Sequence, residues 1–388
     1  MWWVWLPLLL VFNLPARAAD VPPVLLGLVV PTAGESGPVA QSMRRAAELA
    51  VAEWSPRLNR RVELRVKEDL FDPQQAVVTA EQLVEEGVWG VVGHFFSSSS
   101  IPASVVYRDA GIPQVTATST HPRLTAQGFD SVFRVCGRDD QQALSAAEFV
   151  LTRLRARRIG LVHDRTEYGR GLAEAFRREV VRRAPGRVVA EESLAQGDRD
   201  FGPQVARLKE ARSDVIYFGG LFREAAYLVR QLRQAKVAAD FLSDDAVLDP
   251  EFVKLAGQDA ALGTYLTFAP DPNLLDSARP FMRTYEERYG SVGPYELHTY
   301  DSVGVLLHGI QAGKPADNSR DELRKVVRAI RATPYQGVLG TLRWDRRGDL
   351  VAAPYVVYVT KRGGSVQGWF DQLAPPTPAG TGAQPREH

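Results

Sequence analysis

Short apolar runs alternate with amphipathic segments along nearly the whole chain. VLLGLVV (24–30), VWGVVG (88–93) and DVIYFGG (214–220) have the length and the Val and Ile content of buried β-strands. The segment 38–54 instead carries apolar residues at helical spacing, namely Val39, Met43, Ala46, Ala47, Ala50 and Val51. We therefore expect strands and helices to follow one another in turn.

The same criteria place the other elements. Asp72-Pro73 predicts a helix start, with Asp72 as the cap and Pro73 in the first turn. Other helices are expected at about 99–109, 140–156, 169–184, 202–211 and 222–236. Other strands are expected at 62–69, 113–118, 158–164, 187–194 and 241–247.

This alternation predicts an α/β fold of parallel sheets covered on both faces, with right-handed crossovers. The βα units are too many for one sheet of ordinary width, which favours two doubly wound, Rossmann-like lobes. Ligands of such sheets bind beyond the carboxyl ends of the strands. HFFSSSS (94–100) lies at such an end, because it follows VWGVVG and opens a helix whose free N–H groups favour an anion.

Composition excludes several functional classes. The 388 residues are 45% hydrophobic and 24% charged, as in an ordinary globular protein, and the formal net charge is +1. A nearly neutral chain has no strong field to attract nucleic acid or an anionic membrane. We therefore expect neither as a partner.

The two ends of the chain differ from the rest. MWWVWLPLLLVFNLPARA (1–18) is apolar and ends in a small-x-small pattern, which is typical of a secretory signal peptide. A membrane anchor is the alternative, but Pro7 and Asn13 interrupt a run that is shorter than the about 20 residues of a spanning helix. We expect a cleaved signal, a periplasmic mature chain without membrane insertion, and a flexible tail at 372–388.

No motif of catalysis or metal binding stands out. The chain lacks a complete GxGxxG, a P-loop and a GxSxG elbow, and its six histidines have no metal-ligand spacing. Neither Asp139-Asp140 nor Asp244-Asp245 suggests a catalytic dyad, because sequence neighbours face different ways on a strand. His94 is expected to face inward, and the single Cys136 to be buried and structural. We expect a protein that is not an enzyme.

At this point the sequence resembles the periplasmic leucine/isoleucine/valine-binding protein family, the type I solute-binding proteins of branched-chain amino acid ABC transporters. The resemblance covers about residues 24–370 and is carried by strings that occur in the family's order: DPQQAV (72–77), VVGHFFSSSS (91–100), LTAQG (124–128), GRDDQQ (137–142), EYGRGLA (167–173), GDRDFGPQVARLK (197–209), DVIYFGG (214–220), GPYELHTY (293–300) and GTLRWDRRGDL (340–350).

The resemblance implies two Rossmann-like lobes joined by three crossovers that close over a ligand. Lobe I would comprise 20–138 plus 268–344, and lobe II 139–267 plus 345–371. The crossovers are expected near Arg138–Asp139, Thr264–Thr267 and Trp344–Asp349.

The resemblance also implies ligand-binding residues. Ser97 would bind the amino acid, Thr118 and Ser119 would offer mainly backbone atoms, and Thr120 would offer its N–H and hydroxyl to the α-carboxylate. In lobe II, Tyr168 would close over the ligand and Asp245 would pair with the α-ammonium. The contacts to the ligand's side chain would come from Tyr295, Phe95, Phe96 and Leu221.

Plainer interpretations of these residues stay open. Asp244 is an alternative to Asp245, and either could be a solvated acid at a strand end. Ser98 to Ser100 could simply cap a helix, and Tyr168 and Tyr295 could be packing aromatics.

The sequence departs from the family's pattern at three places. The branched-chain receptors carry a disulfide at positions that match Phe71 and Phe96, which we expect to touch. Leu221 stands where the family has a pocket tyrosine, and Val39 or its neighbours where it has another aromatic residue. These changes alter the side-chain end of the pocket.

The resemblance implies a monomeric receptor without a cofactor that delivers a neutral, branched-chain-like amino acid to the permease of an ABC importer. Two alternatives remain: a ligand that is not an amino acid (an amide, urea or an aromatic acid), or sensing for a signalling partner.

Overall fold

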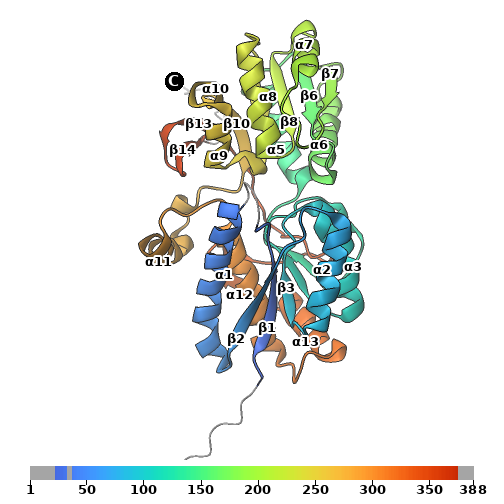
Figure 1. Cartoon of the computed structure of the whole chain (residues 1–388), viewed down its shortest axis with the longest axis vertical. Coiled ribbons are helices and arrows are strands. Elements are labelled where there is room, and N and C mark those ends of the chain that lie inside the picture. Colours follow the sequence, from blue (N-terminus) through green and yellow to red (C-terminus); the bar gives the residue numbers. More distant parts are fainter. Residues whose placement is uncertain (1–21, 33–36, 375–388) are drawn as a thin grey trace, which may run out of the picture.

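The computed structural model describes residues 22–32 and 37–374, which form two α/β lobes stacked along the long axis of the molecule (Figure 1). The expected signal peptide and nearly all of the expected tail lie outside these residues. The two-lobed α/β fold is confirmed.

Lobe I is built on a five-stranded parallel sheet with the order β2-β1-β3-β4-β5. Its strands are β1 (Val24–Val29), β2 (Val62–Lys67), β3 (Gly90–Val92), β4 (Gln114–Thr116) and β5 (Val132–Arg134). Its helices from the first half of the chain are α1 (Gly37–Leu58), α2 (Pro73–Glu85), α3 (Ser97–Ala110) and α4 (Arg123–Ala126). A later segment returns to this lobe as α11 (Arg279–Tyr289), α12 (Glu296–Gly313), α13 (Arg320–Ala332), β11 (Tyr335–Gly337) and β12 (Gly340–Leu342).

Lobe II is built on a seven-stranded sheet with the order β14-β13-β10-β9-β8-β6-β7. Its strands are β6 (Ile159–His163), β7 (Val188–Ser193), β8 (Val215–Gly219), β9 (Asp240–Ser243), β10 (Tyr265–Phe268), β13 (Val356–Gly364) and β14 (Gly368–Gln372). Its helices are α5 (Asp139–Thr152), α6 (Glu167–Arg183), α7 (Gly202–Glu210), α8 (Phe222–Gln234), α9 (Pro250–Ala256) and α10 (Gln258–Ala261). The short 3-10 turns are η2 (Asp245–Val247), η3 (Pro272–Leu274) and η4 (Asp276–Ala278).

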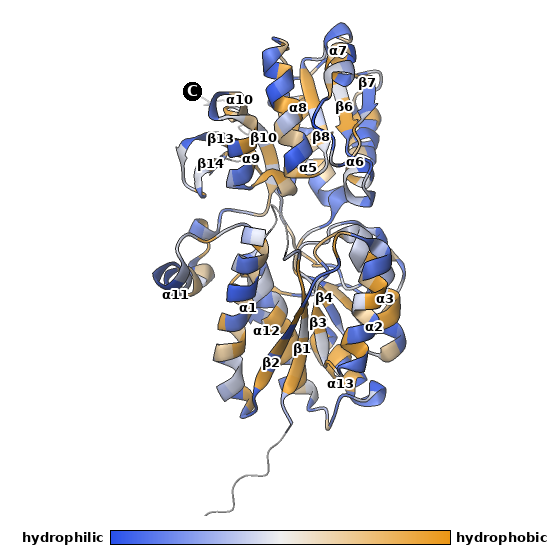
Figure 2. Ribbon diagram, in the orientation of Figure 1, coloured by the Kyte–Doolittle hydropathy of each residue, from blue (hydrophilic) through white to orange (hydrophobic). Residues whose placement is uncertain are grey.

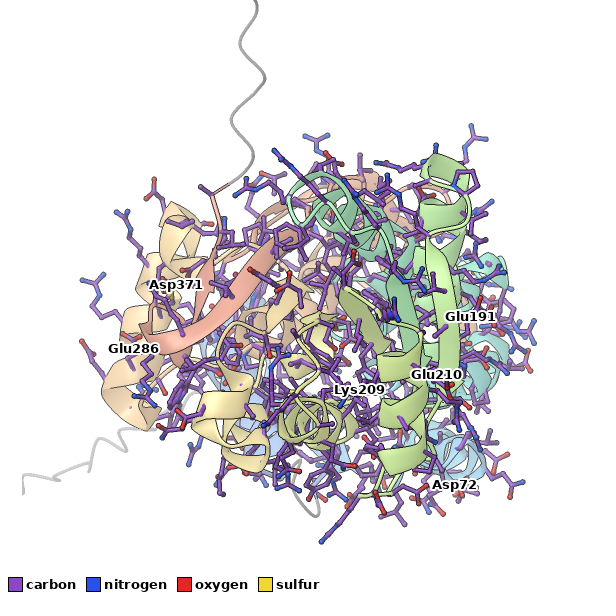
Figure 3. All side chains as sticks on the ribbon, turned by 90° about the horizontal axis from the view of Figure 1, so that it is seen from above. Asp72, Glu191, Lys209, Glu210, Glu286 and Asp371 are labelled. Carbon is purple, nitrogen blue, oxygen red and sulfur yellow. The ribbon has the colours of Figure 1, made fainter. Side chains whose placement is uncertain are left out.

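Burial follows the hydropathy pattern, with apolar strands inside and polar helix faces outside (Figure 2). The exposed, charged side chains of Glu191, Glu210 and Glu286 lie on the outer surface (Figure 3). Two strand glycines let helices approach the lobe I sheet closely. A Cβ on Gly27 would lie 2.9 Å from Leu83 of α2, and one on Gly90 would lie 2.7 Å from Leu306 of α12.

One of the three expected crossovers falls on a strand of lobe II. Thr264–Thr267, where we expected the second crossover, lies largely in β10, which pairs with β9 and β13 inside the lobe II sheet. The chain therefore leaves lobe II only after Phe268, because the buried TYLTF run fills the middle of that sheet.

The first and third linking segments are joined by one buried carboxylate. Asp349 accepts hydrogen bonds from Arg134 and from Arg138, each at 2.8 Å. Thr125 donates a third hydrogen bond to it at 2.8 Å. Burial alone would raise the pKa of Asp349, but the two guanidinium groups hold it below its usual value. These contacts tie the two crossovers together at the base of the lobes.

Candidate functional site

The carboxyl ends of strands from both lobes meet in one cleft. Five of these strands are followed within a few residues by one that was expected at the site: Ser97 after β3, Thr118 after β4, Tyr168 after β6, Leu221 after β8 and Asp245 after β9. The hydroxyl of Tyr295 in lobe I donates to the carbonyl of Asp245 in lobe II at 3.4 Å. The lobes therefore contact each other across the cleft.

Two cavities lie on either side of Tyr295. The larger, of about 140 Å³, is lined at one end by Thr118, Thr120 and Asp245 and at the other by the linking segments. The smaller, of about 40 Å³, is lined mostly by apolar side chains: Val39, Phe95, Phe96, Leu221, Phe222, Ala246 and Leu248. The larger cavity thus has a few polar groups at one end of a mostly apolar wall, whereas the smaller one is apolar nearly throughout.

Lobe I offers a helix N-terminus to the cleft. The helix expected from about residue 99 begins at Ser97, and Phe96 precedes it without any side-chain cap. The suggestion that Ser98 to Ser100 cap this helix is therefore wrong. The Ser100 hydroxyl instead donates to the carbonyl of His94 at 3.0 Å. The hydroxyl of Ser97 accepts the His121 N–H at 3.3 Å, which leaves its own hydrogen free to donate.

The loop after β4 lies against this helix. Thr118 donates its hydroxyl to the Phe95 carbonyl at 2.7 Å. Ser119 is fully engaged within lobe I, because its N–H binds the Thr116 hydroxyl, its hydroxyl binds Ser100, and its carbonyl accepts from Arg134. The Thr120 hydroxyl is buried and has no hydrogen-bond partner among the described residues. The Thr120 side chain lies close to the Asp139 carboxylate of lobe II and lowers the pKa of that acid.

A buried network supports the start of α3. The imidazole of His94 lies between the Asp69 carboxylate, at 2.7 Å, and the Tyr107 hydroxyl, at 2.9 Å. His94 has no exposed surface, so the expectation that it faces inward is confirmed. Its contacts fix the backbone from which Ser97 projects.

In lobe II the neighbouring acids Asp244 and Asp245 have different roles. Asp244 accepts the N–H groups of Gly220 at 2.8 Å and Ala246 at 3.1 Å, so its carboxylate holds the turn after β9. Asp245 lines the larger cavity and accepts the Tyr168 hydroxyl at 2.7 Å, and the Gln142 side chain also lowers its pKa. A carboxylate can accept about four hydrogen bonds, so Asp245 keeps unused capacity. Burial raises the pKa of both acids.

Asp139, which the sequence analysis passed over, is the second acid of this site. It opens α5, has no exposed surface, and neither carboxylate oxygen has a hydrogen-bond partner among the described residues. Burial, with a further contribution from the charge of Asp245, raises the pKa of Asp139 to about 8. The backbone N–H of Asp139 donates to the Thr120 carbonyl at 3.1 Å, which joins the two lobes here. The charge of Asp245 thus raises the pKa of Asp139 as well as that of its sequence neighbour Asp244.

Aromatic rings line the smaller, apolar cavity. Phe95 packs edge-on against Tyr295, with ring centroids 5.4 Å apart, and against Phe96 at 4.8 Å. Phe71 and Phe96 touch with ring centroids 4.5 Å apart, as expected from the positions of the family's disulfide. The expectation that Phe71 and Phe96 touch is thus confirmed.

Cys136 lies in the first linking segment and is 8% exposed. Burial raises the pKa of its thiol to about 12, which confirms the expectation of a buried cysteine. Among the described residues, no cluster of three or more His, Cys, Asp or Glu side chains could hold a metal ion. None of the described helices is both long and apolar enough to cross a membrane.

Two doubly wound lobes, with a cleft between the carboxyl ends of their strands, define a two-lobed binding protein. Comparison with known proteins agrees: residues 23–365 match the family model described as "Periplasmic binding protein". The chain belongs to this family.

Relatives and solved structures cover almost the whole chain. It is 35% identical to an amino acid binding protein of Pseudomonas aeruginosa, covering 86% of this chain and 89% of the relative. It is 31% identical to the Leu/Ile/Val-binding protein of Escherichia coli, covering 90% and 93%. The structure of a leucine-binding protein from Thermotoga maritima superposes with a TM-score of 0.81 at 26% identity, covering 90% and 98%. A solute-binding protein from R. palustris in complex with benzoate shares the fold, with a TM-score of 0.79 at 17% identity, covering 91% and 96%.

Proposed function

We propose that this protein is an extracytoplasmic solute-binding protein that captures a neutral α-amino acid between its lobes and delivers it to an ABC importer. One observation carries the proposal. Two buried carboxylates of lobe II, Asp139 and Asp245, form no ion pair among the described residues, and lobe I supplies the N-terminus of α3 with the Ser97 hydroxyl as a donor. An α-amino acid presents the matching pair of charges.

The carboxylate end of the ligand belongs to lobe I. The first N–H groups of α3, the Ser97 hydroxyl and the Thr120 hydroxyl are hydrogen-bond donors for an anion. Ser119 has no polar atom left for the ligand and holds the loop in place. Thr118 contributes to the wall of the cavity.

The ammonium end belongs to lobe II. An ammonium has three N–H donors, and Asp245 and Asp139 each offer oxygens without enough donors of their own. A buried carboxylate without a partner is costly, and the ligand's cation removes that cost in the closed state. Tyr168 orients Asp245, and the ligand favours closure because neither lobe alone serves both of its charges.

The side chain of the ligand enters the smaller, apolar cavity. A space of about 40 Å³ between Phe95, Leu221 and Tyr295 suits a small aliphatic group. A periplasmic location is supported by the description of the family, and delivery to an ABC importer follows from the resemblance to the solute-binding proteins of ABC transporters.

The proposal is tested with three molecules that share one side chain. L-leucine carries both charges, 4-methylpentanoate lacks the ammonium and isoamylamine lacks the carboxylate. Calorimetry on the purified mature protein should show L-leucine binding at least about 100-fold more tightly than either analogue, since each leaves a buried polar group unpaired. Benzoate serves as the comparison with the R. palustris protein. Binding of benzoate or 4-methylpentanoate as tight as that of L-leucine would contradict the ammonium site.

A further inference from the structure

A contact between the lobes lies at the edge of the cleft, apart from the groups assigned to the ligand. His121 lies in the loop that follows β4 of lobe I, and Gly171 lies in the first turns of α6 in lobe II. A Cβ on Gly171 would lie 2.5 Å from Nε2 and 2.6 Å from Cδ2 of His121. The imidazole therefore rests on the bare backbone of the helix, where a larger residue would displace it.

The imidazole is held in this position by both lobes. Its Nδ1 accepts the Arg123 N–H at 3.1 Å, so the neutral ring carries its hydrogen on Nε2. That nitrogen faces the Glu167 carboxylate at 3.9 Å, and Arg123 forms an ion pair with the same carboxylate at 3.2 Å. Burial lowers the pKa of His121, which keeps the ring neutral at pH 7.

The contact is joined directly to the proposed ligand groups. The His121 N–H donates to the Ser97 hydroxyl, and Glu167 immediately precedes Tyr168 at the start of α6. His121 and Arg123 belong to lobe I and Glu167 and Gly171 to lobe II, so these contacts join the lobes.

We propose that His121, Arg123, Glu167 and Gly171 form an interlobe latch that stabilises the closed state and raises ligand affinity without touching the ligand. A group that contacts its partner only in the closed state shifts the equilibrium by its own interaction energy. Gly171 is a positioning residue in this latch, because its missing side chain makes room for the imidazole. The effect on amino acid affinity rests on the proposed function, whereas the effect on closure does not.

The Gly171→Ala variant distinguishes the latch from a purely structural role of Gly171. The latch predicts weaker ligand binding without a loss of stability, whereas a structural role predicts a loss of stability. Alanine favours a helix over glycine, so the ligand-free variant should unfold at a temperature no lower than wild type. Its affinity for L-leucine should nevertheless fall about three- to tenfold, because the closed state is disfavoured. Gly202→Ala, in the first turn of α7 on the far side of lobe II, is the matched control and should leave affinity unchanged (Figure 1).

A double-mutant cycle identifies the partner. His121→Ala should lower affinity by a similar factor, and Gly171→Ala should add nothing in the His121→Ala background, since the displaced ring is already gone. Glu167→Gln, which weakens only the exposed side of the latch, should cost at most about threefold. Additive effects of Gly171→Ala and His121→Ala would overturn the latch.

Closure itself is measured without relying on the ligand. Gln82→Cys on α2 and Arg178→Cys on α6 place exposed labelling sites on the two lobes, while Cys136 stays buried as an unreactive thiol. Spin-label distances, with and without L-leucine, should show a smaller closed population in Gly171→Ala than in wild type. An equal closed population, or a wild type that never closes, would overturn the latch. Failure of L-leucine to bind, with the ligand-free populations still different, would instead overturn only the proposed ligand.

Discussion

Lobe I and lobe II share one arrangement of strands and present opposite chemistry to the cleft. In lobe I the strand order is β2-β1-β3-β4-β5, and the carboxyl ends of its strands carry a helix N-terminus and hydroxyl groups, all of which can donate hydrogen bonds. In lobe II the corresponding strand order is β7-β6-β8-β9-β10. Asp245 follows the carboxyl end of β9, and Asp139 opens α5. In the proposed function, the fold therefore sets where a ligand binds, while a few residues after the strands set the sign of the charge that each lobe accepts.

The largest expected effect comes from removing the charge of lobe II. Asp245→Asn should weaken L-leucine binding by about 2–4 kcal/mol, or roughly 30- to 1,000-fold, because a buried charge pair loses one partner. Asp244→Asn is the matched control: it should lower the unfolding temperature, since Asp244 holds two backbone N–H groups, but should keep the preference for leucine over 4-methylpentanoate. Calorimetry measures the affinities of both variants for L-leucine and 4-methylpentanoate. Equal losses of L-leucine affinity in the two variants would show that Asp245 does not bind the ammonium.

Asp139→Asn should have a smaller effect, with a pH signature. Because the pKa of Asp139 in the empty site is about 8, binding an ammonium below pH 8 requires loss of its proton. Wild-type affinity should therefore rise with pH, by up to about tenfold per unit between pH 6 and 8, and then level off. Calorimetry at several pH values should show a flat profile for Asp139→Asn, and a slope equal to that of wild type would count against this role.

The same substitution should stabilise the empty protein. The folded pKa of about 8 lies above the ordinary value of 3.8, so the unfolded chain releases this proton first as the pH rises. The free energy of unfolding therefore falls between about pH 4 and pH 8 on account of this group. At pH 8, the free energy of unfolding of Asp139→Asn should be about 1–3 kcal/mol higher than that of wild type. Denaturant unfolding without ligand measures this, and a less stable variant would show that Asp139 has a structural partner.

On the lobe I side, single changes should cost less, because the carboxylate is shared among several donors. Ser97→Ala should weaken L-leucine binding by about 1 kcal/mol, or roughly fivefold, and should leave the pH profile unchanged. Ser98→Ala, one residue along the same helix, is the control and should bind as wild type does. Calorimetry distinguishes them, and equal losses would assign the effect to the helix rather than to the Ser97 hydroxyl.

The smallest effect is expected at the rim of lobe I. Phe71→Ala removes the ring that packs on Phe96 but none of the groups assigned to the ligand. It should lower the free energy of unfolding by about 0.5–1.5 kcal/mol in chemical denaturation and change L-leucine affinity by less than twofold. A larger change in affinity would show that Phe71 helps to hold Ser97 in position.

Much of the fold could be predicted from the sequence, because buried strands and amphipathic helices carry clear periods. The Asp72-Pro73 helix start and the DVIYFGG strand needed only local chemistry. The second crossover was misplaced because β10 is flanked by turns on both sides and its pairing with β13 is distant in sequence. Asp139 was passed over because its significance comes from burial next to Asp245, and neither burial nor that distance is visible in GRDDQQ. The Gly171–His121 contact escaped notice for the same reason.

The carboxylate of Asp349 has a mechanical consequence. Asp349 binds Arg134 and Arg138 at once, so two of the three expected connections between the lobes are held together and should bend about one common axis rather than independently. Two rigid lobes that share one hinge axis can move relative to each other essentially only by rotation about that axis. Ligand capture would then be transmitted to the outer surface as one angle, so a partner that senses that angle needs no contact with the captured molecule.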